Sequence, residues 1–387
     1  MIIQPAERTL SVKEYYFSKK NREIAAMNAD GRAEPVINLG IGSPDGRPPQ
    51  CAIDALCSSA QRGDTHAYQP YVGIPELRSA YAGWYSRWYG VSLDPSTEIQ
   101  PLTGSKEGIL IISLAFLNKG DKVLVPDPGY PTYSSSARLC EAEIVPYDLV
   151  EELGWQPDFE ALEKMDLSGV KMMWTNYPNM PTGAPADPAL YEKLVDFGRS
   201  HGIMICNDNP YSFILADAHH SILAVPGAKD CCLELNSLSK AHNMAGWRLG
   251  MVASSADVIY EILKVKSQLD SGIFRPLQLA AVEALSQGPD WFRDLNAVYR
   301  GRQKAAGRIF DLLGVRYNPA SQGLFLWGRV PDGEDPVAIS DKLLHEAGVF
   351  ITPGFIFGRN GEKYLRISLC AREEVLARAY DKIKSVL

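Results

Sequence analysis

Six short apolar runs recur along the middle of the chain, and the stretches between them have apolar residues at helical spacing. Runs that are apolar on both faces and alternate with helices are typical of a largely parallel β-sheet covered by helices. The pattern therefore predicts an α/β protein. The predicted strands cover residues 122–126, 143–147, 170–177, 203–208, 233–237 and 249–253.

Two helices are well marked in this part of the chain. Asp187 can cap a helix that begins at Pro188, and Leu190, Leu194 and Phe197 then share one face. A second helix is predicted over residues 75–89, where five large side chains recur on one side. Such a stripe indicates a core-facing surface rather than an aromatic ligand cage.

The pattern changes after Pro289. A long charged helix over residues 291–313 leads into short strands around 323–330 and 363–369 and a final helix from Glu373. This predicts a smaller α+β domain, and a chain of 387 residues is expected to form more than one core. We expect residues 1–47 to form an N-terminal arm and part of the small domain, 48–285 the large domain, and 286–387 the rest of the small domain.

Composition narrows the function classes. An apolar fraction of 46% and a charged fraction of 22% are globular values, and a net charge of −7 disfavours a nucleic-acid partner. The first twenty residues lack the apolar run of a signal peptide, and no stretch is long enough to span a bilayer, so a cytoplasmic protein is expected.

The seven cysteines are odd in number and form no C-x-x-C pair, which fits a reducing compartment and predicts neither a zinc ribbon nor a redox motif. Cys231 and Cys232 are adjacent in what reads as a strand, so we expect their side chains on opposite faces. No metal site is predicted; the pair His219 and His220 lacks further ligands at useful spacing and reads as a surface loop.

The segment from Asn236 to Arg248 carries the strongest chemical signal. An apolar strand ends in Ser237 and Lys240, and Arg248 follows after a glycine-bearing loop. Burying a lysine without a partner is costly, and a Schiff base is one way to resolve that cost. Arg248 can offer a fixed fork to a phosphate, and Ser237 a hydroxyl donor. Taken alone, Lys240 is better interpreted as a surface lysine and Arg248 as a salt-bridged arginine. Taken together with Ser237, the two cations are better interpreted as parts of a ligand site.

Asp208 follows directly on a predicted strand, and ligands of parallel sheets gather at such carboxyl ends. A carboxylate there can keep a pyridine nitrogen protonated, which makes the ring an electron sink. Tyr211, three residues later, can hydrogen-bond a ring hydroxyl. The surrounding Asn-Asp-Asn-Pro sequence is also typical of a turn, and a turn at this place is compatible with a ligand contact from Asp208.

Small residues open a predicted helix at Gly104, Ser105 and Lys106, where backbone amides and the helix N-terminus favour a phosphate. The Gly40-Ile-Gly42 stretch is not a dinucleotide fingerprint, because Asp45 occupies its third glycine position. Arg366 lies within a short alternating strand near the C-terminus. An arginine there pairs either with an internal acid or with a ligand carboxylate, and the sequence alone leaves both open.

Taken together, the motifs resemble the class I/II aminotransferases of the type I pyridoxal-phosphate fold, in the same order over nearly the full length. Besides the sites above, the resemblance rests on residues 38–45, 68–78, 103–108, 127–133 and 176–183. It implies a mostly parallel seven-stranded sheet with a smaller α+β domain, and it implies pyridoxal 5′-phosphate as the cofactor.

The resemblance also implies roles for individual residues. Lys240 forms the Schiff base and moves the proton, Asp208 pairs with the pyridinium nitrogen, Tyr211 with the ring hydroxyl, and Tyr130 stacks on the ring. The remaining implied contacts are to the phosphate, from Gly104, Ser105, Lys106, Ser237, Arg248 and the neighbouring subunit's Tyr68, and to the substrate α-carboxylate, from Gly42 and Arg366. A homodimer with shared sites follows from the role of Tyr68.

One position departs from the family pattern. Met180 stands where an asparagine usually hydrogen-bonds the ring hydroxyl, so either Asn179 shifts to serve or Tyr211 acts alone. The expected reaction is a ping-pong transfer of an amino group between an amino acid and a 2-oxo acid.

The sequences of the motifs at residues 103–108 and 127–133 resemble those of the branch that holds aspartate, alanine and diaminopimelate aminotransferases. This resemblance implies glutamate and 2-oxoglutarate as the second pair of substrates. A carbon–sulfur β-lyase or an acyl-transferring synthase of the same fold, or a non-catalytic cofactor-binding protein, remain alternatives. Tyr15, Tyr16 and Arg275 are weak candidates for substrate contacts.

Overall fold

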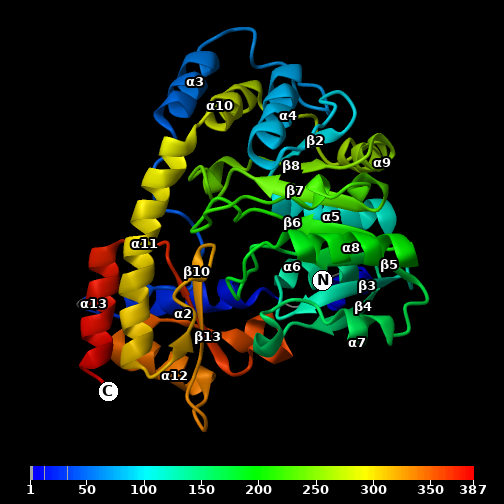
Figure 1. Cartoon of the computed structure of the whole chain (residues 1–387). Coiled ribbons are helices and arrows are strands. Elements are labelled where there is room, and N and C mark those ends of the chain that lie inside the picture. Colours follow the sequence, from blue (N-terminus) through cyan, green and yellow to red (C-terminus); the bar gives the residue numbers. More distant parts are fainter. Residues whose placement is uncertain (1–2, 13, 33) are drawn as a thin grey trace.

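The computed structural model describes residues 3–12, 14–32 and 34–387. Its centre is a seven-stranded sheet with the order β2-β8-β7-β6-β5-β3-β4, in which β8 alone runs antiparallel to its neighbours (Figure 1). The strands are β2 (Ile99–Leu102), β3 (Lys122–Asp127), β4 (Glu143–Asp148), β5 (Val170–Thr175), β6 (Met204–Asp208), β7 (Cys232–Ser237) and β8 (Gly250–Ala253).

Helices cover both faces of this sheet, which is why its inner strands β6, β7 and β8 are almost wholly buried. On one face, α5 (Ser105–Phe116), α6 (Pro131–Leu139) and α9 (Ala256–Lys266) enclose one apolar cluster. On the other face, α4 (Pro75–Tyr89), α8 (Pro188–His201) and α10 (Arg275–Leu285) belong to the larger cluster, which continues into the C-terminal part. The predicted cap of α8 is confirmed, since the Asp187 side chain accepts from the Ala189 amide.

The six predicted strands are all present, with ends that shift by one or two residues. The seventh, β2, escaped the pattern because it is four residues long and includes a proline at its third position. The prediction for the adjacent cysteines was wrong. Cys231 precedes β7 with φ −142° and ψ 4°, so it is not extended, and its sulfur lies 3.7 Å from that of Cys232.

The C-terminal part is an antiparallel sheet of four strands in the order β12-β13-β10-β9, flanked by helices (Figure 1). Its strands are β9 (Arg316–Tyr317), β10 (Phe325–Arg329), β12 (Thr352–Pro353) and β13 (Tyr364–Ser368). Its helices are α11 (Pro289–Leu312), α12 (Pro336–Lys342) and α13 (Glu373–Lys384).

The N-terminal segment packs against this C-terminal part. The strand β1 (Ile37–Asn38) pairs with β11 (Val349–Phe350), and α2 (Tyr16–Ala29) contributes Ile24 to a small cluster with Leu344 and Phe350. These contacts support the division at residues 1–47, 48–285 and 286–387, which we keep as a proposal. The remaining α-helices of the described residues are α1 (Glu7–Leu10), α3 (Gln50–Ala60) and α7 (Phe159–Glu163).

Among the described residues, no helix combines the length and the apolar character that crossing a bilayer would need.

Candidate active site

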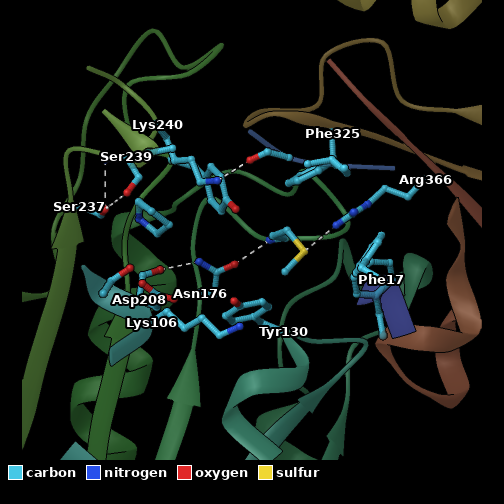
Figure 2. Close-up of a pocket in the computed structure, with 18 of the residues that line it drawn as sticks. Phe17, Lys106, Tyr130, Asn176, Asp208, Ser237, Ser239, Lys240, Phe325 and Arg366 are labelled. Carbon is cyan, nitrogen blue, oxygen red and sulfur yellow. Dashed lines mark hydrogen bonds between the residues drawn. The ribbon is translucent and has the colours of Figure 1, made fainter. Parts of the chain in front are cut away.

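A cavity of about 330 Å³ opens beyond the carboxyl ends of β6 and β7, where the large sheet faces the small one (Figure 2). Parallel strands converge with their carboxyl ends at one edge, so the residues that follow them line a common crevice. The charged residues of the lining are Lys106, Asp208, Lys240, Arg248 and Arg366.

Lys240 reaches the cavity from the loop after β7. Its Nζ donates a 2.6 Å hydrogen bond to the Gly42 carbonyl oxygen, which comes from the N-terminal segment (Figure 2). Burial lowers the pKa of the Lys240 ammonium, and the neighbouring cations Arg366 and Arg248 lower it further. A lysine with a lowered pKa has more of the neutral amine that acts as a nucleophile or a base.

Asp208 ends β6 and is 5% exposed. Its Oδ2 accepts a 3.0 Å hydrogen bond from the Tyr133 hydroxyl, whereas its buried Oδ1 has no partner within the described residues. Burial raises the pKa of this carboxyl to about 7, although the Tyr133 hydrogen bond and the Lys240 charge oppose the rise. A buried carboxylate oxygen without a partner is costly, so this wall of the cavity is suited to a cationic N–H donor.

The raised pKa of Asp208 leads to a testable pH dependence. The folded-state pKa of about 7 exceeds the ordinary value of 3.8, so the folded carboxyl holds its proton more tightly than the unfolded one. Its contribution to stability is therefore greatest below the ordinary value and is lost as the pH rises through about 7. We expect the cofactor-free protein to lose stability relative to Asp208→Asn between pH 5 and pH 8, as measured by thermal unfolding. Added pyridoxal phosphate should narrow this gap, and parallel curves for the two proteins would contradict the assignment.

A cup for an anion lies beside these residues. Gly104 begins α5 without a side-chain cap and with φ +92°, and a Cβ there would lie 2.1 Å from an Arg248 guanidinium nitrogen. The backbone can thus approach Arg248 closely only because this residue is glycine. Ser237 and Ser239 are joined by a 2.9 Å hydrogen bond between their hydroxyls. Free helix amides, hydroxyls and a guanidinium are together a phosphate site.

Arg366 lies at the opposite end of the cavity, on β13, and is 4% exposed. Its Nη2 donates to the Gly40 carbonyl at 2.8 Å and its Nη1 contacts the Met180 sulfur at 3.3 Å (Figure 2). Burial lowers the pKa of Arg366 to about 10. No carboxylate of the described residues pairs with it.

Aromatic rings enclose the Arg366 guanidinium. The rings of Phe325, Phe357 and Phe17 have their centroids 3.9, 4.5 and 5.5 Å from its central carbon. Ring faces stabilise a cation but satisfy none of its N–H donors in the plane of the guanidinium. The Arg366 Nε has no partner within the described residues, and each terminal nitrogen keeps a second N–H, so the guanidinium can still bind a carboxylate of a ligand.

The structure brings most of the predicted site residues together. Those that line the cavity are Gly42, Ser105, Lys106, Tyr130, Asp208, Tyr211, Ser237, Lys240, Arg248 and Arg366, and Gly104 adjoins it through Arg248.

Asn179 and Tyr68 lie outside the lining. The Asn179 side chain is occupied by hydrogen bonds to the Asn176 carbonyl and to Thr182, which hold the turn before α8. Tyr68 is 90% exposed, on the surface of this subunit.

Several lining residues were not among the predicted site residues. Tyr133 follows Tyr130 by three residues in α6, so helical spacing alone could have placed both on one face. Asn176 comes directly after β5, and Asp208 ends the neighbouring strand β6, so the end of a predicted strand could have indicated both. The sequence gave no signal for the three rings around Arg366, because they come from segments far apart in the chain: Phe17, Phe325 and Phe357. Of the weak candidates, Tyr15 lines the cavity and Tyr16 and Arg275 do not.

Comparison with known proteins agrees with this geometry. The family "Aminotransferase class I and II" matches residues 34–383. The chain is 38% identical to an LL-diaminopimelate aminotransferase of Dehalococcoides mccartyi over 98% of this chain and 97% of that one. It is 39% identical to one of Nitratidesulfovibrio vulgaris, over 98% of both chains.

Among solved structures, substrate-bound BacF from Bacillus subtilis has a TM-score of 0.93 and 35% identity, over 100% of this chain and 98% of that one. A variant of Thermus thermophilus aspartate aminotransferase has a TM-score of 0.92 and 27% identity over the whole of both chains.

The fold, the cavity and these matches define one class of protein: the chain belongs to the class I and II aminotransferases. It is a pyridoxal-phosphate-dependent enzyme whose substrates are small molecules, an amino acid and a 2-oxo acid. The residues present fit that cofactor. The unpartnered Asp208 oxygen suits a protonated ring nitrogen, the half-buried Lys240 amine suits an aldehyde, and the anion cup suits a phosphate.

Proposed function

We propose that this enzyme moves an amino group between an amino acid and a 2-oxo acid in a ping-pong cycle, with Lys240 as the residue that binds the cofactor covalently and moves the proton. One observation carries the proposal. The Lys240 amine, the unpartnered Asp208 carboxylate oxygen and the free Arg366 guanidinium face the same cavity.

Each part of the cofactor then has a partner. Asp208 holds the ring nitrogen, Tyr211 donates to the ring oxygen, and Tyr130 covers a ring face. Ser237, Arg248 and the N-terminus of α5, from Gly104 to Lys106, hold the phosphate. When bound, pyridoxal phosphate supplies an electron sink that stabilises negative charge at the substrate Cα.

The protein's own residues control the proton and the substrate. Arg366 and the Gly42 backbone bind the α-carboxylate, which fixes the orientation of the Cα bonds. The Lys240 nitrogen lies beside Gly42, so an anchored substrate presents its Cα proton to the amine. The lowered pKa of Lys240 allows this amine to accept and return the proton near neutral pH.

We further propose that Tyr211 is the one side-chain donor to the ring oxygen. A methionine at position 180 cannot donate, and Asn179 is committed elsewhere. Asn176 accepts from the Met180 amide and donates to the Asp208 carbonyl, so its oxygen and one of its two N–H groups are already in use. Burial raises the pKa of the Tyr211 phenol, which keeps its proton available for donation.

The substrates follow from the relatives by similarity. Because both curated relatives described above are named LL-diaminopimelate aminotransferases, we propose substrates of the aspartate, alanine and diaminopimelate type, with glutamate and 2-oxoglutarate as the partner pair. We also propose a cytoplasmic homodimer in which Tyr68 of each subunit reaches the phosphate of the other. Its exposure leaves the ring free to do so.

The first experiment is the absorbance of the purified protein loaded with pyridoxal phosphate, before and after each amino acid of a panel. We expect a band between about 360 and 430 nm that bleaches with glutamate and with LL-diaminopimelate or aspartate, and returns with 2-oxoglutarate. Release of pyruvate from cystathionine without amino transfer would instead favour a carbon–sulfur lyase.

A further inference from the structure

Two surface loops of the large sheet are tied into one body. The first, residues 66–74, carries Tyr68 and is called here the tyrosine loop. The second, residues 267–274, joins α9 to α10 and is called the joining loop. A Cβ on Gly272 of the joining loop would lie 2.3 Å from the Gln69 carbonyl oxygen, so the two backbones touch and glycine, with φ +89°, is required there.

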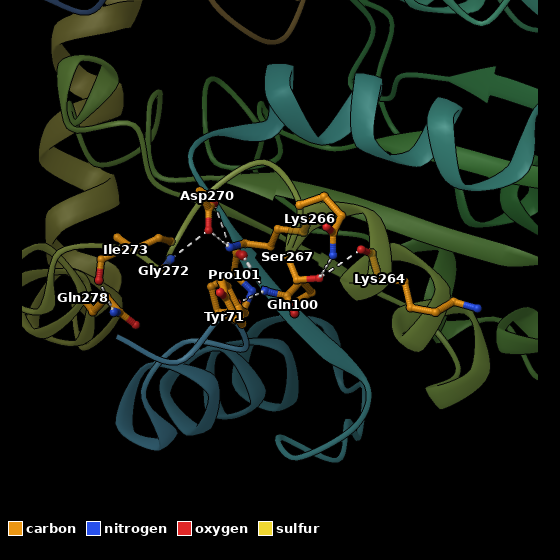
Figure 3. Close-up of polar contacts among 11 residues, drawn as sticks. Tyr71, Gln100, Pro101, Lys264, Lys266, Ser267, Asp270, Gly272, Ile273 and Gln278 are labelled. Carbon is orange, nitrogen blue, oxygen red and sulfur yellow. Dashed lines mark hydrogen bonds and ion pairs between the residues drawn. The ribbon is translucent and has the colours of Figure 1, made fainter. Parts of the chain in front are cut away.

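A buried amide bridges the ends of both loops. Gln278 is 0% exposed, and its Oε1 accepts from the Ile74 amide at 2.8 Å. Its Nε2 donates to the Ile273 carbonyl at 2.5 Å (Figure 3). Both polar atoms of one side chain are thus used to hold two segments that lie two hundred residues apart. A buried polar group that bridges two segments with both its atoms satisfied fixes their relative position.

A buried ion pair fixes the middle of the joining loop. Lys266 is 1% exposed, and its Nζ lies 2.8 and 2.9 Å from the two carboxylate oxygens of Asp270 (Figure 3). The same carboxylate accepts from the Gly272 amide at 2.9 Å, the residue at which the loops touch. The ammonium therefore acts on the contact between the loops through Asp270.

Gln100 of β2 fixes the tyrosine loop itself. Its Nε2 donates to the Tyr71 carbonyl at 2.9 Å and to the Pro101 carbonyl at 2.8 Å, while its buried Oε1 has no partner within the described residues. The Gln100 side chain thus donates from its Nε2 to this loop although its Oε1 is left without a hydrogen bond. The backbone is held, yet Tyr68 and Tyr71 remain 90% and 45% exposed.

From these contacts we infer that Gln100, Lys266 and Gln278 are positioning residues, which hold the tyrosine loop in the form that presents Tyr68 to the cofactor phosphate of a second copy of the chain. The inference rests on the shared site of the proposed function. A loop that is ordered before binding loses less conformational entropy when its tyrosine engages the phosphate. The three residues touch neither cofactor nor substrate, so their effect passes through Tyr68.

A double-mutant cycle on cofactor affinity tests this. The dissociation constant of pyridoxal phosphate is measured by absorbance titration of the cofactor-free protein, at concentrations where sedimentation shows the same assembly for every variant. Tyr68→Phe removes a hydroxyl-to-phosphate hydrogen bond and should weaken binding roughly tenfold. Lys266→Met and Gln100→Met should each weaken binding about fivefold with Tyr68 present and less than about twofold in the Tyr68→Phe background.

Two features keep the result interpretable. Lys264→Met removes an ammonium from the same helix, α9, at a residue whose pair is the exposed Glu261, and should leave affinity unchanged in both backgrounds. Gln100→Met removes the donor to the Tyr71 and Pro101 carbonyls together with a buried unpaired oxygen, and it leaves the Lys266–Asp270 pair intact, so it tests the inference independently of Lys266→Met.

The possible outcomes separate the two proposals. Losses of equal size in both backgrounds, or no loss with either variant while Tyr68→Phe weakens binding, would overturn the positioning role alone. Unchanged binding by Tyr68→Phe would overturn the shared site, and the positioning role with it.

Discussion

Replacing Lys240 with alanine should lower kcat for amino transfer by about 10⁴-fold or more, because one side chain supplies both the covalent attachment and the proton transfer. The amine is placed for both tasks. Its Nζ lies 2.6 Å from the Gly42 carbonyl oxygen in the wall of the cavity, and burial lowers its pKa. The described residues that line the cavity include one lysine besides Lys240, namely Lys106. The Lys106 Nζ lies 4.9 Å from the centre of the Tyr15 ring.

Single-turnover absorbance measures this effect directly. Lys240→Ala should still bind pyridoxal phosphate through the anion cup and Asp208, but with the spectrum of the free aldehyde. A small primary amine added to the solution should restore part of the proton transfer. Lys264→Ala, an exposed lysine of α9, is the matched control and should retain wild-type rates. A Lys240→Ala enzyme within about tenfold of wild type would assign the base to another residue.

Replacing Arg366 with methionine should lower kcat/KM by roughly a hundredfold or more, since loss of a buried charge-assisted contact costs about 2–5 kcal/mol. The guanidinium has no carboxylate partner in the described part of the chain, and three phenylalanine rings exclude water from it. Arg248 and Arg366 are the arginines among the described lining residues, and Arg366 offers its rigid guanidinium at the end away from the anion cup. Arg366→Lys keeps the charge but loses the fork, so it should recover only part of the activity.

Stability separates this binding role from a structural one. Removing a buried cation that has no acidic partner should leave the melting temperature unchanged or higher, because its desolvation cost disappears. Arg316→Met, on β9 of the same sheet, removes an exposed arginine and should change neither quantity. A marked fall in melting temperature with Arg366→Met, or an unchanged kcat/KM, would contradict the assignment to the substrate carboxylate.

The sequence alone determined the class of fold and the chemistry of its main site. Alternating apolar runs predicted six strands of the large sheet, because each strand must be apolar on both faces to lie between helices. Lys240 and Asp208 were found for a local reason: each follows a predicted strand, and the carboxyl ends of parallel strands meet at one edge.

Features that depend on contacts between distant segments were decided only by the tertiary structure. The sequence left open whether Asn179 or Tyr211 alone takes the place of the usual asparagine at Met180. A local turn uses the Asn179 side chain, and the Met180 sulfur contacts Arg366. The rings around Arg366 come from Phe17 of α2, Phe325 of β10 and Phe357 of the helical turn after β12, which no spacing along the chain connects.

The same limit applies to the tyrosine loop and its buried supports. Gln100, Lys266 and Gln278 carry no signal in the sequence, because an isolated glutamine or lysine reads as a surface residue until the fold buries it. Periodicity and strand ends are local properties, so the sequence specifies them directly. Which side chains meet across the cavity, and which polar groups lose their water, depends on the packing of segments hundreds of residues apart, and only the folded chain decides it.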